Sequence, residues 1–141
     1  MWLKDKGDHF FKRHDYTAAI NAYSKALEND KEFLTGRINR ATAFIKVRAF
    51  TLCIDDLTDA FKQIEDMKKE EREADQEFYD KMIARSLVKR GASYAWTSQF
   101  DKAIGDFEKI LDSDVYKQIL GELDVASLAK DLAVIKNRQN S

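Results

Sequence analysis

Two pairs of charged residues stand four positions apart in segments with helical periodicity. Lys4 and Asp8 form the first pair, and Arg85 and Lys89 form the second. Residues four apart lie on one face of an α-helix, so each pair presents both side chains to the same side. Ammonium and guanidinium groups form charge-assisted hydrogen bonds with carboxylates. Together with Asn39, these residues indicate chemistry of binding rather than of reaction.

The residues that could support covalent or metal chemistry are few and scattered. His9 and His14 are five apart, so they do not share a helix face, and no Cys or Asp cluster completes a metal site. Cys53 is the single cysteine, and we interpret it as a buried small hydrophobe, with a reactive thiol as the alternative. A lone cysteine forms no disulfide framework, which favours a reducing compartment. We expect no enzyme activity, no cofactor and no metal.

Composition narrows the choice of partners. The 141 residues include no proline, and 35% of them are charged, yet the formal net charge is only -1. Such a balance predicts helices with solvated faces and no nucleic-acid partner. We find no signal peptide and no apolar run near 18 residues, so no membrane partner is expected. A helix predicted to start at Trp2 suggests a domain excised from a longer protein.

The elements that must position these residues repeat along the chain. Small and aromatic residues recur after 34 residues, and again after a further 50. The three sets are Gly7, Phe10, Tyr16, Ala19, Tyr23 and Ala26; Ala41, Phe44, Phe50, Cys53, Leu57 and Ala60; Gly91, Tyr94, Phe100, Ala103, Phe107 and Ile110. A period near 34 is typical of tetratricopeptide repeats, which stack helix pairs into a superhelix with a concave binding face. The predicted fold is therefore all-α: one domain over 1–141, with three helix pairs, a C-terminal capping helix and no strand.

The pattern gives approximate boundaries for seven helices. The repeats span 2–30, 34–64 and 78–112, and their helices are expected at 2–13, 16–29, 34–48, 51–64, 78–97 and 100–112. Asp15 and Thr17 are candidate caps, and Gly7 and Ala19 mark a close helix approach. The insert at about 62–77 is predicted as helical extensions around a short turn, with a mobile loop as the alternative. One amphipathic capping helix is expected at about 114–138, its stripe formed by Val115, Ile119, Leu123, Ala126, Leu132 and Ile135.

The polar residues of the first helices resemble the carboxylate clamp of chaperone-binding tetratricopeptide domains. In that family a Lys and an Asn of the first helix, an Asn of the second, and a Lys and an Arg of the third hold a peptide C-terminus. The corresponding residues here are Lys4, Asp8, Asn39, Arg85 and Lys89, with the last two cations exchanged. The resemblance implies as ligands the Glu-Glu-Val-Asp tails of the ninety- and seventy-kilodalton heat-shock chaperones. Further groove-lining candidates are Phe11, Lys12, Thr42, Ile45 and Lys46.

Asp8 departs from that clamp, which has Asn at this position. Ionised Asp cannot donate to a ligand carboxylate and repels it. Two like charges at about 4 Å cost roughly 1 kcal/mol in water and roughly 4 kcal/mol in a surface groove. We therefore expect weak tail binding, on the order of tens of micromolar or worse, that Asp8→Asn strengthens, unless Lys4 or Arg85 neutralises the charge.

The segments WLKDKGDHFF, YTAAINAYSKAL, NRATAF and VKRGASYA also resemble the C-terminal domain of the dynein axonemal assembly factor four family. That resemblance implies a cytoplasmic co-chaperone adaptor that works with other dynein assembly factors to pre-assemble the dynein arms of cilia. Similar arrays, such as sperm-associated antigen one or R2TP subunits, are alternatives. So is a structural scaffold or oligomerisation module, whose degenerate clamp at Asp8 binds a different assembly factor.

Overall fold

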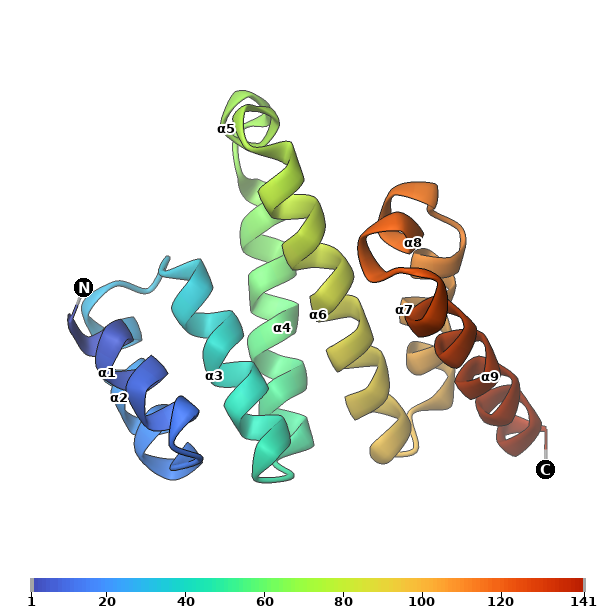
Figure 1. Ribbon diagram of the computed structural model, residues 1–141, viewed down its shortest axis with the longest axis horizontal. Coiled ribbons are helices and arrows are strands. Elements are labelled where there is room, and N and C mark those ends of the chain that lie inside the picture. The colour runs from blue at the N-terminus through green and yellow to red at the C-terminus, as the bar shows by residue number, and fades with distance from the viewer. Residues whose placement is uncertain (1, 141) are drawn as a thin grey trace. The chain divides into compact units, whose positions relative to one another are not determined.

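The computed structural model describes residues 2–140, and within that range the chain forms nine helices and no strand. It divides into two compact units, the first ending at Asp66 and the second beginning at Met67 (Figure 1). Helix content and the absence of strands in the described range confirm the predicted all-α class. No helix in the described range is both long and apolar enough to cross a membrane.

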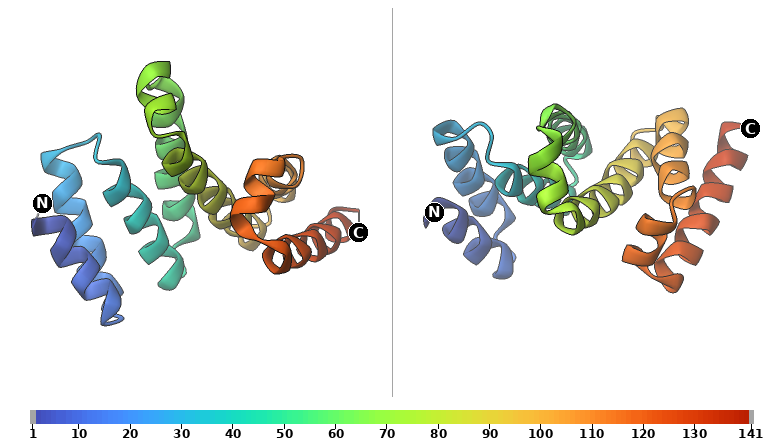
Figure 2. Two further views of the ribbon diagram at one scale, coloured as in Figure 1. Left: turned by 45° about the horizontal axis from the view of Figure 1, so that its top comes forward. Right: turned by 90° about the horizontal axis from the view of Figure 1, so that it is seen from above.

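The first unit holds two antiparallel helix pairs. Its helices are α1 (Trp2–Lys12), α2 (Tyr16–Asn29), α3 (Leu34–Lys46) and α4 (Phe50–Asp66). α1 packs on α2, α3 packs on α4, and α2 packs on α3 and so joins the two pairs, as the blue, cyan and green ribbons of Figure 2 show. Ala41, Cys53 and Leu57 are fully buried between the second pair, with Ile38, Phe44, Ile45 and Phe61 around them. Cys53 is thus the buried small residue that the repeat pattern predicts.

The second unit holds the third helix pair and the C-terminal helices. It contains α5 (Lys69–Ala74), α6 (Gln76–Trp96), α7 (Phe100–Leu111), α8 (Asp114–Leu120) and α9 (Glu122–Gln139). α6 packs on α7, α8 contacts both helices of this pair, and α9 packs on α7 and α8. Leu128, Leu132 and Ile135 supply the buried face of α9.

Two glycines allow the helices of a pair to approach closely. A Cβ atom built on Gly7 would lie 2.5 Å from Cε1 of Tyr23, and one built on Gly91 would lie 2.5 Å from Cε1 of Phe107. Real Cβ atoms do not come so near an aromatic carbon, so each ring occupies the space that the missing side chain leaves. These contacts confirm the close approach predicted at Gly7. Ala19 of α2 has no exposed surface.

The turns inside the three pairs share one backbone conformation. His14, Arg48 and Ser98, which occupy equivalent repeat positions, have φ of 62°, 62° and 61°. The next amide donates to a carbonyl five residues back: Asp15 N to Phe10 O (2.9 Å), Ala49 N to Phe44 O (2.8 Å) and Gln99 N to Tyr94 O (2.8 Å). This is the Schellman closure of a helix C-terminus, here formed without glycine. Asp15 then caps α2 as predicted, because its Oδ1 accepts from Ala18 N at 3.2 Å.

A buried ion pair joins the two helices in the second and third pairs. Arg40 donates Nε and Nη2 to Asp56 at 2.8 and 2.5 Å, and Arg90 donates the same atoms to Asp106 at 2.8 and 2.7 Å. Both aspartates are almost fully buried, with exposed fractions of 4% and 3%. The forked geometry satisfies both carboxylate oxygens, which such burial requires.

The prediction of seven helices is wrong in two places. Part of the insert forms the short helix α5, which is separate from both of its neighbours. The predicted capping helix is also broken at Gly121, whose φ of 89° is unfavourable for any residue with a side chain. The break shifts the helical phase, so Val115, Leu123 and Ala126 of the predicted stripe are exposed, while Leu128 is buried.

Candidate functional site

Asp8 lies at the centre of a polar cluster in the first unit. Its Oδ2 is 2.7 Å from Lys4 Nζ, one turn earlier on α1. Its Oδ1 accepts a hydrogen bond from Asn39 Nδ2 of α3 at 3.3 Å, and a second from the hydroxyl of Tyr23 on α2. The structure therefore brings together Lys4, Asp8 and Asn39, and it adds Tyr23, which the sequence did not indicate as part of a site.

The contacts of Asp8 favour its ionised form. Burial opposes ionisation, but hydrogen bonds from Lys4 and Tyr23, with the charges of Lys4 and Lys12, hold the pKa of Asp8 below its ordinary value. The hydrogen bond to Asp8 in turn raises the pKa of Lys4. Burial and the same carboxylate raise the pKa of the Tyr23 hydroxyl. At neutral pH the cluster is thus an ammonium–carboxylate pair with a neutral phenol.

This arrangement changes what Asp8 does to an incoming anion. Lys4 supplies the opposite charge directly, so a ligand carboxylate would meet a nearly neutral pair instead of an isolated negative charge. The same contacts also occupy Lys4 and Asn39 as donors. An incoming carboxylate must therefore compete with Asp8 for the two groups that would bind it.

Arg85 and Lys89 lie together in the second unit. With Val88 they form the α6 wall of a cavity of about 340 Å³. Leu120, Asp124, Ser127, Leu128 and Asp131 of the C-terminal helices form the opposite wall. The cavity thus brings two cations and two carboxylates together with the apolar side chains of Val88, Leu120 and Leu128.

The remaining groove candidates lie on α1 and α3. Phe11 stacks edge-on against Tyr16 with ring centroids 5.3 Å apart, and Lys12 is exposed. Thr42 donates its hydroxyl to Ile38 O at 3.1 Å. Ile45 packs against the core of the second pair, and Lys46 is exposed. Their part in ligand binding remains a prediction.

Three residues of these clusters escaped the sequence analysis. The repeat pattern predicts Tyr23 only as a packing residue, although its hydroxyl donates to the Asp8 carboxylate. Asp124 and Asp131 line the second-unit cavity, but the predicted unbroken helix over 114–138 gave no reason to place them beside Arg85. Their seven-residue spacing, which keeps both on one helix face, was the available signal.

Comparison with known sequences finds two groups of relatives. The chain is 31% identical over 130 residues to Hsp70-Hsp90 organizing protein 1 of Glycine max, covering 89% of this chain and 21% of that protein. It is 26% identical over 119 residues to dynein axonemal assembly factor 4 of Pongo pygmaeus, covering 84% of this chain and 26% of that protein. The chain thus spans about a fifth to a quarter of the length of these relatives. No protein-family model matches it.

Comparison with solved structures gives the fold. The first tetratricopeptide domain of Spaghetti (RPAP3), bound to the HSP90 peptide SRMEEVD, superposes with a TM-score of 0.69 at 21% identity, covering 99% of this chain and 91% of that one. The second such domain of human RPAP3, in complex with the HSP70 peptide SGPTIEEVD, gives 0.67 at 22% identity, covering 95% and 92%. These likenesses confirm the tetratricopeptide-repeat fold that the 34-residue period predicts.

Proposed function

We propose that this tetratricopeptide-repeat domain, a relative of the Hsp70-Hsp90 organizing proteins and of dynein axonemal assembly factor 4, is a co-chaperone-type adaptor. Its ligand is the acidic C-terminal tail of ninety- and seventy-kilodalton heat-shock chaperones. We infer a non-catalytic role in the cytoplasm, in the pre-assembly of axonemal dynein arms together with other assembly factors. The observation that carries the proposal is the clustering of clamp-type residues, Lys4 with Asn39 and Arg85 with Lys89, within their units.

The two clusters have different parts in this proposal. Lys4 and Asn39 offer an ammonium and an amide on adjacent first helices of their pairs, both now held by Asp8. Arg85 and Lys89 offer two cations in a cavity that also contains the apolar side chains of Val88, Leu120 and Leu128 and the carboxylates of Asp124 and Asp131. A tail of sequence Glu-Glu-Val-Asp carries carboxylates for the cations and one aliphatic side chain for the apolar residues.

The test is a titration of the domain with SRMEEVD and SGPTIEEVD peptides, followed by calorimetry or by fluorescence anisotropy. Each peptide is also prepared with a C-terminal amide, which removes the terminal charge and should abolish most of the binding. Lys89→Ala or Arg85→Ala should weaken binding by about 1–3 kcal/mol, whereas Lys109→Ala, on α7 and outside the cavity, should have no effect. Equal binding of the acid and amide peptides, or no binding of either tail, would contradict the proposal.

The scaffold alternative has its own support in Asp8. The Asp8 carboxylate contacts Lys4, Asn39 and Tyr23 at once, so the hydrogen-bonding groups of this surface are already paired within the domain. If neither tail binds the wild type or the Asp8→Asn variant, that result favours a scaffold that docks another assembly factor over a tail-binding adaptor.

A further inference from the structure

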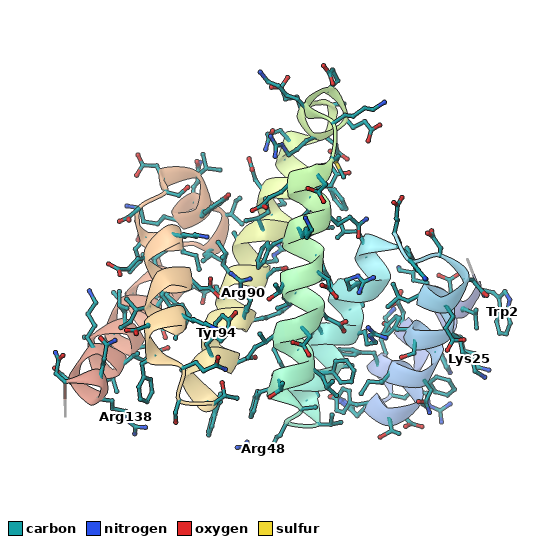
Figure 3. All side chains as sticks on the ribbon, turned by 180° about the vertical axis from the view of Figure 1, so that it is seen from behind. Trp2, Lys25, Arg48, Arg90, Tyr94 and Arg138 are labelled. Atoms are coloured by element: carbon teal, nitrogen blue, oxygen red, sulfur yellow. The ribbon has the colours of Figure 1, made fainter. Side chains whose placement is uncertain are left out.

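A second cavity lies on the outer face of the first helix pair, away from the Asp8 cluster. It measures about 510 Å³, and its lining residues within the described range all belong to α1 and α2: Trp2, Leu3, Lys6, Phe10, Ala18, Asn21, Ala22, Lys25, Glu28 and Asn29. Trp2 is 68% exposed there, an unusual position for so large an aromatic side chain. Figure 3 shows Trp2 and Lys25 pointing outward at the same edge of the first unit.

Comparison with the other repeats shows what this cavity lacks. Lys6 and Ala22 stand 34 residues before Arg40 and Asp56, the buried ion pair of the second pair. The third pair has Arg90 and Asp106 at the same positions (Arg90 is labelled in Figure 3). In the first pair the cation is retained, but the carboxylate is replaced by the methyl group of Ala22.

A second position of the first pair also has no carboxylate where the second pair has one. Asp59 of the second pair lies 3.5 Å from Arg37, and its first-pair equivalent is Lys25. The four positions therefore hold two arginines and two aspartates in the second pair, but Leu3, Lys6, Ala22 and Lys25 in the first. Glu28 is the one carboxylate among the described lining residues, so the cavity carries a net positive charge.

The aromatic side chains keep Lys6 at the cavity. Its Nζ lies 5.4 Å from the centroid of the Trp2 ring and 6.0 Å from that of Phe10. Cation–π contacts of this kind orient an ammonium group without neutralising it. Lys6 is therefore held beside an exposed indole with its charge available to a carboxylate.

The second pair also indicates what kind of element covers such a face. The equivalent stripe of α3 packs against the preceding helix α2, and Arg40 Nη1 donates to Ser24 Oγ of α2 at 3.2 Å. We propose that the Trp2–Lys6–Phe10 face binds an acidic amphipathic helix of a partner protein. That helix would supply apolar contacts to Trp2 and a carboxylate to Lys6 and Lys25, in place of the one that Ala22 lacks.

The test uses a designed helix of Leu, Ala and Glu with both ends blocked, and a matched helix in which Lys replaces Glu. Blocked ends remove the terminal carboxylate on which chaperone-tail binding depends. Binding is followed by NMR of the two tryptophan indole N–H signals, because Trp96 lies in the other unit and serves as an internal control. The Glu helix should shift the Trp2 signal and leave that of Trp96 unchanged, and the Lys helix should shift neither.

Three variants locate the interaction. Charge reversal by Lys6→Glu with Lys25→Glu should weaken binding by about tenfold or more, as expected when two exposed ion pairs are lost. Lys109→Glu, at the third-repeat position that matches Lys25, should leave binding unchanged. Ala22→Asp should also weaken binding, because it gives Lys6 a carboxylate within the domain.

Several outcomes would overturn the inference. A Glu helix that shifts Trp96, or that SRMEEVD displaces, would place binding at another site. Unchanged affinity after the double charge reversal would remove the roles of Lys6 and Lys25. If light scattering shows a dimer that the double reversal converts to a monomer, the occupant is a second copy of this chain and not a partner helix.

Discussion

Replacing Asp8 with Asn is the most informative change to the candidate clamp. In the wild type, Lys4 Nζ is 2.7 Å from Asp8 Oδ2, and Asn39 donates to the other carboxylate oxygen. The amide keeps the size of the side chain and can still accept from Tyr23. It removes the negative charge, releases Lys4 and presents a donor to the ligand.

The effect of Asp8→Asn on tail binding can be estimated from the solvent exposure of the Lys4–Asp8 ion pair. The Lys4 and Asp8 side chains are 33% and 31% exposed, and ion pairs of this kind contribute about 0.2–1 kcal/mol. A charge-assisted hydrogen bond from a released ammonium to a ligand carboxylate contributes about 1.5–3 kcal/mol. Asp8→Asn should therefore strengthen tail binding by about 1–2 kcal/mol, or roughly 5- to 30-fold. It should lower the free energy of unfolding by less than about 1 kcal/mol.

The assay is anisotropy of labelled SRMEEVD with wild type and variant at two salt concentrations. Binding should weaken for both as salt rises, because exposed charges are screened over about 8–10 Å. Glu77→Gln is a matched control, since it removes the carboxylate of another pair spaced four residues apart, Glu77 with Lys81 at 2.9 Å. This control should bind the peptide as the wild type does.

Two results would refute the reasoning. Weaker binding by Asp8→Asn, with Glu77→Gln unchanged, would mean that the carboxylate orients Lys4 and Asn39 productively instead of withholding them. Unchanged binding in Asp8→Asn together with loss in Lys89→Ala would mean that the ligand engages only the second unit.

Three further predictions concern stability. Gly7→Ala should destabilise the domain by about 1–3 kcal/mol in chemical denaturation, because its Cβ would lie 2.5 Å from the Tyr23 ring. Gly105→Ala should instead stabilise the domain by about 0.5–1 kcal/mol, because its Cβ would have no atom within 4 Å beyond its chain neighbours and the backbone of its own helix. Asp106→Ala should cost about 3–5 kcal/mol because it leaves the largely buried Arg90 without its carboxylate. A loss of only about 0.2–1 kcal/mol, as for an exposed ion pair, would contradict this prediction. The lowered pKa of Asp8 means that its ionic contribution is present above the ordinary value of 3.8 and is lost as pH falls through the lower folded value. The stability difference between wild type and Asp8→Asn should therefore shrink in acid, and a constant difference in urea titrations from neutral pH downward would contradict this sign.

The repeat pattern predicted the helix pairs because small residues at close approaches are needed wherever two helices meet. Gly7, Gly91 and Cys53 occupy such positions, and the structure places all three in buried contacts. The end of the chain was less predictable, since no repeat constrains it. The helix predicted over 114–138 is interrupted at Gly121 because of the positive φ of that residue, which the spacing of residues in the sequence does not reveal.

In the candidate site, contacts within one helix could be predicted from the sequence, but contacts between helices could not. The spacing of Lys4 and Asp8 within one helix is visible in the sequence, so their ion pair follows from helix geometry. The hydrogen bonds from Tyr23 and Asn39 come from two other helices and depend on tertiary packing. The buried Arg90–Asp106 pair was missed because charged residues were interpreted as solvated surface, although the pair repeats Arg40–Asp56 at the 50-residue step.

The conformation of the turns within the helix pairs does not depend on the side chains at those turns. Their closure is made by backbone amides and carbonyls, and His14, Arg48 and Ser98 occupy the same left-handed position with unrelated side chains. Each costs about 1–2 kcal/mol relative to a right-handed residue, a strain that the paired helices tolerate. We therefore expect that substitution at His14, Arg48 or Ser98, or attachment of a dye or cross-linker there, leaves the angle between the two helices of the pair unchanged. They are natural attachment points for distance measurements within each unit.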